Sequence, residues 1–408
     1  MAGPLQGIVV LDLSRILAGP WATQVLADYG AEVLKVEHPL GGDDTRKWGP
    51  PYLKDSSGQE TRESAYYLSA NRGKRSLAID FSQPDGQALV RQLAARADVL
   101  VENFKVGGLA RYGLGYEQLS ALNPRLVYLS ISAFGQDGPD AAKPGYDAMI
   151  QGMGGLMSLT GVPDGEPGAG PQKVGVAVAD LMCGMYAVSA ILGALFERER
   201  SGRGQYIDLS LLDTQVAWLA NQNLNYLVSG RPPQRQGTAH PNIVPYQAFA
   251  TADGHLMLAV GNDAQFGRFC AAAGAPELAS DTRFKTNQDR VAHRAELVPG
   301  VAALLRSRTT RDWLAALEVA QVPCGPINDL AQVFAEPQVR HRALRMELPH
   351  PTAGSAPGVR NPVRFSRTAI GYERAPPPLG ADTMSALEER LGLDATALAD
   401  LAARGVIA

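Results

Sequence analysis

The chain has 408 residues, of which 45% are hydrophobic and 19% charged, a composition that is ordinary for a globular protein. Its 38 basic and 41 acidic residues give a formal net charge of −3, which excludes a bulk polycation that coats nucleic acid. At roughly 150 residues per domain, the length predicts two or three domains with full hydrophobic cores.

The cysteines and the apolar segments indicate the compartment. Cys183, Cys270 and Cys324 are odd in number, far apart and outside any CxxC motif, which argues against disulfides and a zinc site. We expect core thiols and a reducing, cytoplasmic compartment. The first residues lack the build of a signal peptide, and the longest apolar run, residues 181–196, is shorter than the roughly 18–20 residues of a membrane span. We therefore expect no membrane, nucleic-acid or metal partner.

Strands and helices alternate over the first part of the chain. A continuous apolar run at 8–13 predicts a buried parallel strand, followed by a helix at 21–29 that ends at Gly30 and by a strand at 32–36. Further strands are predicted at 76–80, 98–102 and 126–132, and a helix at 84–95. This alternation predicts a doubly wound, Rossmann-like α/β sheet.

The second part of the chain has a different pattern. One long buried helix is predicted after residue 174, ending at Gly202, and a second helical stretch covers 207–228. Residues 245–260 predict a β-hairpin with an Asp-Gly turn. The remaining predictions are helical segments over 262–320, an irregular Pro-rich stretch from about 330 to 380, and short helices near 383–391 and 394–403.

The first βαβ unit suggests dinucleotide binding, because Glu37 ends the second strand where a ribose-binding acid would lie. However, the turn SRILAGP at residues 14–20 lacks the GxGxxG pattern, and the chain has no GxxxxGK[ST] motif. We favour an α/β scaffold without an NAD site or a P-loop.

Two polar clusters are candidate ligand contacts. Residues 71–75 (NRGKR) place three cations directly before a strand, where they could hold phosphates, although composition alone favours a solvated turn. Residues 102–105 (ENFK) follow another strand, at the edge where open α/β sheets bind ligands, and Arg111 lies just beyond.

Asp180 is the most informative single residue, because it lies near the start of an otherwise apolar helix. An unpaired buried carboxylate is costly, so this one must be partnered, neutralised or functional. An acid near a helix N-terminus can also be a cap, and the pattern alone does not separate the two roles. Gly184, one turn later, is expected to leave open space beside it.

Taken in order, these segments resemble the family III CoA-transferases. The resemblance is carried by DLSRILAGPWATQVLADYGAEVLKVE, NRGKRSLAID, ADVLVENF, VGVAVADLMCG, AHPNIVPYQAF, VPCGPIN and FAEPQV, which span nearly the whole chain. It implies an interlocked homodimer of chains with a large CoA-binding domain (1–200 and 331–408), a linker helix (201–230) and a smaller inserted α+β domain (231–330). It implies a CoA thioester as substrate and no prosthetic group.

The resemblance also implies a mechanism centred on Asp180. This aspartate would attack the thioester carbonyl to give a mixed anhydride, and the released CoA thiolate would then form an aspartyl-CoA thioester. The acceptor carboxylate would reverse these steps and leave as the new acyl-CoA. Such intermediates require that water be excluded.

The family's CoA contacts carry over to nine positions of this chain. Leu17 and Ala18 would lie near the pantetheine and thioester, and His38 stands where the family often has an adenine-contacting arginine. The other positions are Asn71, Lys74, Asn103, Phe104, Arg111 and the active-site Tyr146.

Tyr146 also bears on the choice of reaction. The related α-methylacyl-CoA racemases carry a histidine in this Gly-X-Asp segment, and a tyrosine is a poor base near neutral pH. A racemase-like enzyme is therefore the second interpretation, and a non-catalytic CoA-binding protein is a third.

The acceptor is suggested by residues 236–245, which depart from the glycine-rich loop of the oxalate-using members. This segment is more similar to the succinyl-CoA:glutarate transferases, so we expect succinyl-CoA as donor and a dicarboxylate such as glutarate as acceptor. Gly237 and His240 would contact that acceptor, although His240 could equally be a structural loop residue. Itaconate, malate, citramalate, 3-hydroxy-3-methylglutarate and oxalate remain alternative acceptors.

Overall fold

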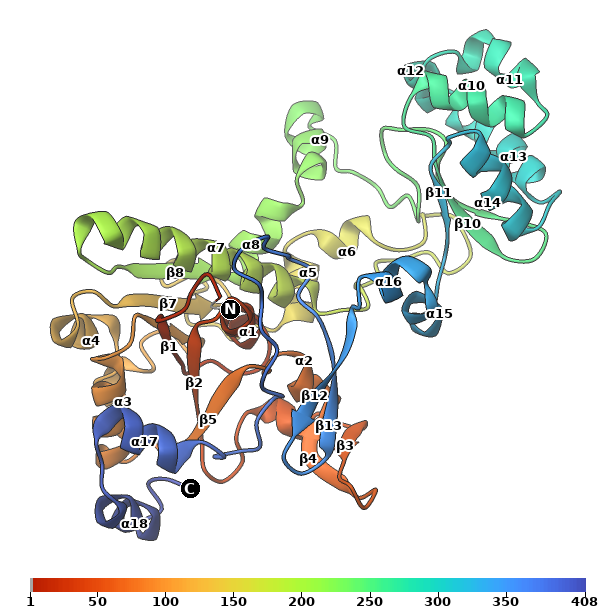
Figure 1. The fold of residues 1–408 in the computed structure, drawn as a ribbon. Helices are drawn as coiled ribbons and strands as arrows, with labels where there is room; N and C mark the ends of the chain where they lie inside the picture. Colours follow the sequence, from red (N-terminus) through yellow and green to blue (C-terminus); the bar gives the residue numbers. More distant parts are fainter. Residues whose placement is uncertain (1–2) are drawn as a thin grey trace. The chain divides into compact units, whose positions relative to one another are not determined.

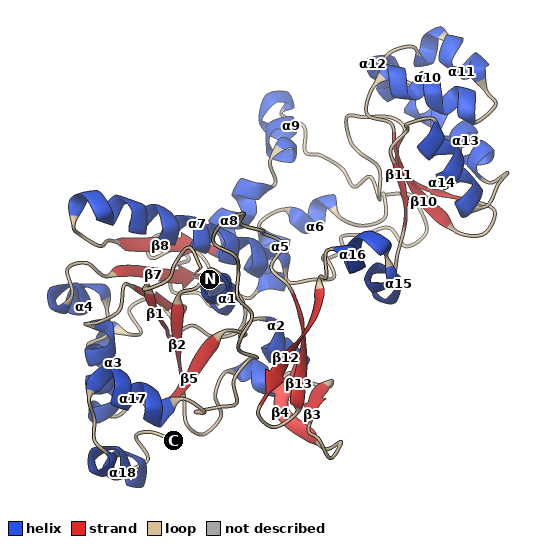
Figure 2. Cartoon of the chain, in the orientation of Figure 1, coloured by secondary structure: helices blue, strands red, loops and turns tan. Residues whose placement is uncertain are grey.

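The computed structural model describes residues 3–408, which form two compact units. Unit 1 contains the described residues up to Leu156 together with Lys173–Arg231 and Gln338–Ala408. Unit 2 contains Met157–Gln172 and Pro232–Pro337. Figure 1 colours both units along the sequence, and Figure 2 shows their helices and strands.

Unit 1 is built around a six-stranded sheet with the strand order β5-β2-β1-β6-β7-β8, in which all neighbouring strands are parallel. The strands are β1 (Val9–Asp12), β2 (Glu32–Glu37), β5 (Lys74–Ala78), β6 (Val99–Glu102), β7 (Val127–Ser132) and β8 (Tyr206–Ser210). Most are apolar and buried on both faces, as a parallel sheet covered by helices requires. The prediction of an α/β fold with a parallel sheet is confirmed.

Strand β8 corrects the prediction of a continuous helical stretch over 207–228. Residues Tyr206–Ser210 instead pair with β7. The helix begins at Leu211, because the Ser210 hydroxyl accepts a hydrogen bond from Asp213 N and caps it. Two helices follow, α8 (Leu211–Trp218) and α9 (Asn221–Ser229).

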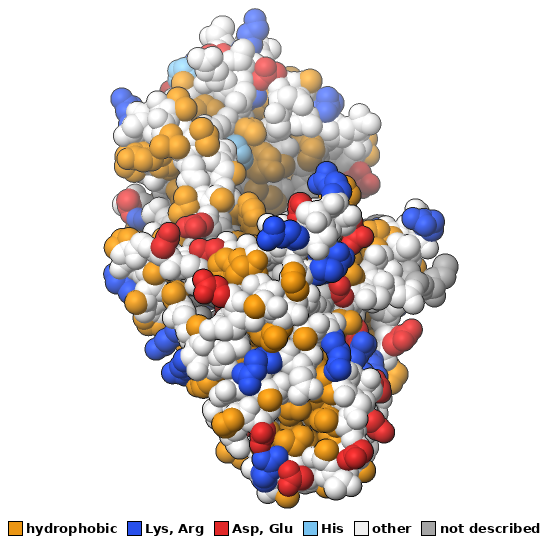
Figure 3. Space-filling model, turned by 90° about the vertical axis from the view of Figure 1, so that its left-hand side faces the viewer, with side chains coloured by type: hydrophobic (Ala, Val, Ile, Leu, Met, Phe, Trp, Pro, Cys, Tyr) orange, Lys and Arg blue, Asp and Glu red, His pale blue; other side chains and the backbone are white. Residues whose placement is uncertain are grey.

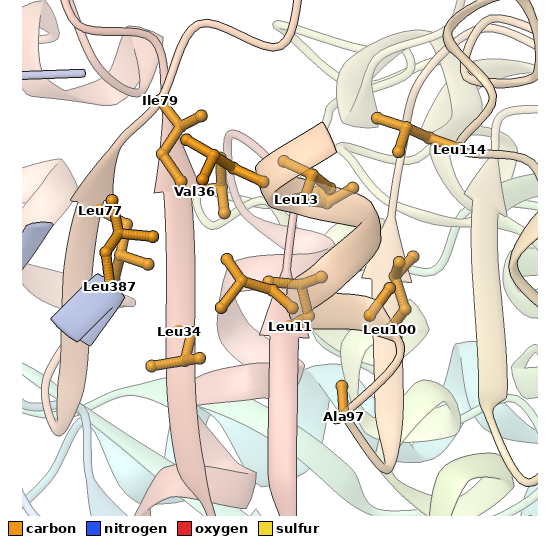
Figure 4. Close-up of a cluster of buried hydrophobic side chains, with 14 of the residues drawn as sticks. Leu11, Leu13, Leu34, Val36, Leu77, Ile79, Ala97, Leu100, Leu114 and Leu387 are labelled. Atoms are coloured by element: carbon orange, nitrogen blue, oxygen red, sulfur yellow. The ribbon is translucent and has the colours of Figure 1, made fainter. Parts of the chain in front are cut away.

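Helices cover both faces of this sheet. Helices α1 (Ala18–Asp28), α5 (Asp147–Met153), α7 (Val178–Ser201) and α8 contribute to the core on one face. The core on the other face includes α3 (Pro84–Ala94), α4 (Tyr116–Leu122), α17 (Thr383–Leu391) and α18 (Ala395–Ala403). Figure 4 shows Leu387 of α17 beside Leu77 of β5, so the end of the chain completes the core that its first strands begin.

The stretch from 330 to 380 is more regular than its proline content predicts. Residues Arg345–His350 (β12) and Gly354–Val359 (β13) form an antiparallel hairpin, in which alternate residues of β12 are buried. The other short elements outside unit 2 are η1 (Asp44–Lys47), β3 (Tyr52–Lys54), β4 (Glu60–Ser64), α2 (Ala65–Ser69) and η2 (Ala110–Tyr112). Helices α6 (Leu156–Leu159) and α16 (Pro337–His341) span sequence boundaries between the units.

Unit 2 contains a three-stranded antiparallel sheet in the order β11-β10-β9. Strands β9 (Tyr246–Ala250) and β10 (His255–Ala259) form the predicted hairpin, and β11 (Cys324–Pro326) joins them. Helices cover this sheet around a separate apolar core. They are α10 (Asp263–Ala272), α11 (Pro276–Ser280), η3 (Thr282–Phe284), α12 (Asn287–Ala292), α13 (Arg294–Leu305) and α14 (Thr310–Val319). Helix α15 (Leu330–Ala335) also belongs to unit 2 but contributes no residue to this core.

Helix α7 is longer than its apolar run suggests, and its length and composition would allow it to cross a membrane. Half of its most apolar window is buried within the chain, where Cys183, Ala187 and Ile191 pack in the core of unit 1. A core helix passes the same test of length and composition. The outer side leaves Tyr186 and Phe196 exposed.

The surface carries charge of both signs. On the face that Figure 3 displays, basic and acidic side chains are interspersed, and hydrophobic side chains gather in patches between them. This distribution agrees with the small net charge of −3.

Fully buried charges lie within unit 1. The Asp12 carboxylate accepts hydrogen bonds from Lys74 Nζ at 3.0 Å and from Thr23 Oγ1 at 2.6 Å, and neither Asp12 nor Lys74 exposes its side chain. Burial would raise the pKa of Asp12, but Lys74 and Lys35 outweigh it and lower the pKa to about 2. Burial also lowers the pKa of Lys74 to about 8, so both groups are ionised at neutral pH.

We expect Lys74→Met to lower the free energy of unfolding by about 3–5 kcal/mol, because it leaves the Asp12 carboxylate buried without its closest cation. Urea denaturation at neutral pH measures this change.

Arg404→Met is the control, because the ion pairs of Arg404 with Asp85 and Asp400 are solvent-exposed and contribute little. A Lys74→Met protein as stable as the original chain would contradict the importance of the buried pair.

Candidate active site

Unit 1 contains a cavity of about 540 Å³ at the carboxyl ends of its strands. Its walls come from the segments that follow β1, β6, β7 and β8, and from the first turn of α7. In the strand order, β1 and β6 are neighbours whose chain connections run to opposite sides of the sheet. Open α/β sheets bind ligands at this reversal of strand order, which makes the cavity the candidate active site.

Reciprocal hydrogen bonds join the two loops that diverge at this point. Asn103 Oδ1 accepts from Arg15 N at 2.8 Å, and Asn103 Nδ2 donates to Arg15 O at 2.7 Å. Asn103 lines the cavity as predicted, but its amide is engaged by the backbone of the neighbouring loop. It therefore fixes the shape of the cavity wall.

Asp180 lies on the first turn of α7, lines the cavity and is 8% exposed. Burial raises the pKa of its carboxyl to about 7, and the neighbouring Asp147 carboxylate adds to the shift. Near neutral pH, a large fraction of the Asp180 carboxyl groups is therefore ionised, although burial leaves them poorly hydrated. A poorly solvated carboxylate facing a cavity is suited to nucleophilic attack.

Asp147 caps the helix that carries Asp180, a role that was not predicted from the sequence. Asp147 Oδ1 accepts from Ala179 N at 2.8 Å and from Asp180 N at 3.4 Å, while its Oδ2 accepts from Gln151 Nε2 at 2.7 Å. Gln151 is fully buried and accepts a hydrogen bond from Val174 N at 2.9 Å. Because Asp147, from α5, caps the N-terminus of α7, the Asp180 side chain is not needed as the cap.

The prediction that Gly184 leaves open space beside Asp180 is wrong. A Cβ at this position would lie 2.8 Å from Ala18 O and 3.0 Å from Trp21 Cδ1. Gly184 instead allows α1 to pack closely against α7. This contact brings Leu17 and Ala18 to the wall of the cavity that Asp180 lines.

Basic and aromatic groups surround the cavity. Arg15, Lys105 and Lys143 line it; Lys105 belongs to the predicted segment 102–105, whereas Arg15 and Lys143 were not predicted as ligand contacts. Phe104, which was predicted, contacts Phe81 edge to face with ring centroids 5.8 Å apart, and the Arg15 guanidinium lies 5.0 Å from its ring. Cations beside aromatic faces are suited to a ligand that combines phosphates with a planar base.

Tyr66 was also missed by the sequence analysis. Burial and the charges of Asp180, Asp147 and Asp43 raise the pKa of its phenol to about 12. Tyr66 therefore stays protonated in the electrostatic field of the site, where it can donate a hydrogen bond.

The cavity brings together six of the residues named from the sequence. They are Leu17, Ala18, Asn103, Phe104, Tyr146 and Asp180. Tyr146 is 67% exposed and precedes Asp147 at the start of α5.

The predicted contacts Asn71 and Lys74 need correction. Both side chains are fully buried, and Asn71 Oδ1 accepts from Lys74 Nζ at 2.9 Å. The three donors of the ammonium are taken by Asp12, Asn71 and Pro20 O, which leaves none for a phosphate. Neither residue lines the cavity.

The two other cations of the NRGKR segment are also paired within the chain. Arg72 contacts Asp28 at 2.6 Å, and Arg75 contacts Glu389 at 2.7 Å. The segment that suggested a phosphate site is therefore part of the structural framework of unit 1. The sequence could not reveal this, because both carboxylates are distant along the chain.

His38 and Arg111 are exposed and lie outside the cavity lining. His38 Nε2 lies 3.8 Å from Asp80 Oδ1, and the Arg111 guanidinium stacks 4.5 Å from the ring of Tyr112. Tyr112 in turn contacts Phe81, so Arg111 borders the same aromatic group as Phe104.

Gly237 and His240 lie in unit 2. His240 Nδ1 accepts from Asn242 N at 3.1 Å, and its ring contacts Tyr246 with centroids 5.4 Å apart. Burial and the nearby Arg294 lower the pKa of His240, so its imidazole is neutral near pH 7. Gly237 has a φ of +58°, a conformation that favours glycine.

No cluster of three or more metal-ligating side chains is found among residues 3–408. Over the same range the three cysteines are free, and burial with the nearby Asp180 raises the pKa of Cys183 to about 12. This thiol therefore stays protonated near neutral pH.

The chain matches the model of CoA-transferase family III over residues 5–383. The chain belongs to CoA-transferase family III. It is therefore an enzyme of the CoA-transferase class, which uses CoA thioesters as substrates.

Individual relatives are similar over nearly the whole chain. A succinate–glutarate CoA-transferase of Agrobacterium fabrum is 53% identical, covering 97% of each chain. The human succinyl-CoA:glutarate CoA-transferase is 44% identical over 99% of this chain and 90% of its own length. The crystal structure of a CAIB/BAIF family protein from Brucella suis has a TM-score of 0.84 and 48% identity, covering 96% of this chain and 100% of that one.

We expect Asp147→Asn to shift the acidic limb of the pH–rate profile to lower pH. A carboxylate nucleophile must be ionised, so the rate falls as the pH drops through the pKa of Asp180, about 7. Removing the Asp147 charge removes one cause of the raised pKa, while burial remains. The measurement is the single-turnover rate between about pH 5 and 9.

Asp44→Asn is the matched control, because Asp44 also lines the cavity but is not among the groups that raise the pKa of Asp180. An acidic limb that stays in place in Asp147→Asn, or that moves equally in Asp44→Asn, would refute the coupling.

Proposed function

We propose that this enzyme transfers CoA from succinyl-CoA to glutarate, with Asp180 as the covalent nucleophile. The observation that carries the proposal is the buried Asp180 carboxyl, with a pKa of about 7, on the wall of the cavity. The choice of substrates is supported by the names of the relatives from Agrobacterium fabrum and human, at 53% and 44% identity.

In the proposed reaction, an Asp180 oxygen attacks the succinyl thioester carbonyl, the C–S bond breaks, and CoA leaves as thiolate. The thiolate then attacks Cγ of Asp180, which releases succinate and leaves an aspartyl-CoA thioester. A glutarate carboxylate attacks the same carbon and expels the thiolate again. Finally, the thiolate attacks the glutaryl carbonyl, so that glutaryl-CoA leaves and the Asp180 carboxylate is restored.

The surroundings of Asp180 suit this sequence of steps. Asp180 is buried, with 8% of the residue exposed, so little hydration has to be removed before attack. The thiolate must wait between steps, and three basic residues line the cavity where they could attract it: Lys105, Arg15, which is paired with Asp44, and Lys143, which is paired with Asp140. The same cations would hold the CoA phosphates, with the adenine against Phe104.

For the acceptor, the proposal retains Gly237 and His240 of unit 2. A neutral His240 would donate a hydrogen bond to the distal carboxylate rather than form an ion pair. Beside it, Arg294 donates to His240 O at 2.7 Å, and its buried Nη1 has no hydrogen-bond partner among the described residues. This free donor supports a carboxylate-binding role for the segment.

The proposal predicts that glutarate gives the highest kcat/KM when succinyl-CoA is offered with a panel of acids. The panel contains glutarate, itaconate, malate, citramalate, 3-hydroxy-3-methylglutarate and oxalate, and mass spectrometry identifies the CoA products. With succinyl-CoA alone, the peptide that contains Asp180 should carry a CoA adduct. Asp180→Asn should retain CoA binding and lose transfer by about a thousandfold or more.

Asp44→Asn is the control for the adduct, because it changes another carboxylate of the cavity and should still form it. Full transfer by Asp180→Asn would reject the nucleophile, and absence of preference for any dicarboxylate would reject the acceptor class. Deuterium exchange at the α-carbon of an acyl-CoA without acceptor would support a racemase instead.

The proposal includes a homodimer joined through α7 and α9. These helices expose large apolar side chains, including Phe196 at 69%, Leu227 at 71% and Val228 at 84%. Large apolar side chains exposed on a helix are typical of a surface that another chain covers.

We expect Leu227→Glu with Val228→Glu to reduce the sedimenting mass from that of two chains to that of one, because two charges would be placed in the interface. Val319→Glu is the control, since Val319 is 87% exposed on α14 of unit 2 and should leave the mass unchanged. An original chain that sediments as a monomer would refute the homodimer.

A further inference from the structure

The loop from β1 to α1 forms one wall of the cavity in an unusual conformation. Arg15, Ile16 and Leu17 line the cavity, and Ile16 has a φ of +70°. A β-branched residue rarely adopts this left-handed conformation, because its Cβ crowds the backbone. The conformation persists only if surrounding groups hold it.

The groups that hold it are the buried ion pair of Lys35 and Asp43. Lys35 Nζ donates to Ser14 O and to Asp43 Oδ2, both at 2.9 Å. Ile16 N in turn donates to both Asp43 carboxylate oxygens at 3.3 Å. The ion pair therefore contacts the backbone at residues 14 and 16 of the loop.

The ion pair is itself fixed by elements other than the loop. Lys35 belongs to β2, an interior strand of the sheet, and neither side chain of the pair is exposed. The Asp43 carboxylate also accepts from Thr45 N at 3.0 Å and from Thr45 Oγ1 at 2.7 Å, and Asp43 N donates to Glu37 Oε2 at 2.9 Å. A fixed frame thus imposes the conformation of Ile16.

Lys35 and Asp43 do not themselves line the cavity. Their hydrogen bonds reach the cavity wall through the loop, at residues 14 and 16. The charge of Asp43 also contributes to the raised pKa of Tyr66. The loop is held on its other side by the Asn103 amide at Arg15. The ion pair and Asn103 together fix residues 14–16, of which Arg15 and Ile16 line the cavity.

We propose that Lys35 and Asp43 are positioning residues for the transfer reaction, which hold Ile16 and Leu17 in place so that the cavity wall excludes water from the acyl intermediates on Asp180. This inference rests on the proposed function. In a loosened site, water attacks Cγ of the aspartyl-CoA thioester, a C–O bond forms, the C–S bond breaks, and the thiolate takes a proton from the water. The products are free CoA and the Asp180 carboxyl group, so succinyl-CoA is hydrolysed rather than used for transfer.

The test is the double variant Lys35→Met with Asp43→Asn, which removes both charges and leaves neither unpaired. We expect it to fold, to transfer CoA about tenfold to a hundredfold more slowly, and to release more free CoA per transfer than the original chain. Hydrogen–deuterium exchange of the peptide that covers residues 14–17 should also become faster.

The matched control is Arg198→Met with Asp98→Asn. This pair joins α7 to the start of β6 at 2.9 Å and lies outside the cavity lining. It should change stability without changing the ratio of free CoA to transfer or the exchange of residues 14–17. If the control raised that ratio as much as the test variant, the effect would be one of stability and the proposal would be rejected.

Two results separate this inference from the proposed function. If the original chain transfers CoA to no acid, the proposed function fails. The hydrogen–deuterium exchange measurement still tests whether Lys35 and Asp43 hold the loop in place. If the original chain is active but its Ile16 amide exchanges as fast as an unstructured one, the positioning role is rejected without any variant. An active double variant with the original ratio of free CoA to transfer rejects it as well.

Discussion

Mutual neutralisation of buried charges is the constraint on which unit 1 depends. Asp12, Lys35, Asp43 and Lys74 all have fully buried side chains. The Asp12–Lys74 pair joins β1 to β5, and the Lys35–Asp43 pair joins β2 to the loop that follows it. A buried charge without its partner costs several kcal/mol, so the pairs form together with the packed sheet or not at all. The same contacts shape the loop that lines the cavity, so the stability of the fold and the geometry of the site share one origin.

The sequence predicted the framework well where the signal was local. The apolar runs that became β1, β2, β6 and β7 are buried on both faces, and no tertiary information was needed to recognise them. Strand β8 was missed because Tyr206–Ser210 directly precedes a helix, and only pairing with β7 separates the two elements. The hairpin of β12 and β13 was hidden by prolines, although alternate burial along β12 is typical of a strand.

The site was predicted in part, and the errors share one physical cause. Asp180, Asn103 and Phe104 line the cavity because strand ends and helix starts bring them to one edge of the sheet. Lys74 was placed wrongly because an unpaired cation in a sequence can have its carboxylate anywhere in the chain, and here that partner is Asp12. Asp147 was overlooked as a cap for α7 because it is distant along the chain from the helix that it caps.

Helix α7 carries Asp180 on its first turn and exposes Phe196 near its other end. Gly184 lets α1 pack closely against α7, so the first turn of α7 is held beside the cavity wall that Leu17 and Ala18 form. Under the proposed homodimer, a second chain would cover the outer side of the helix that carries the proposed nucleophile. Specific activity would then depend on enzyme concentration, falling on dilution at the point where the covering chain is lost.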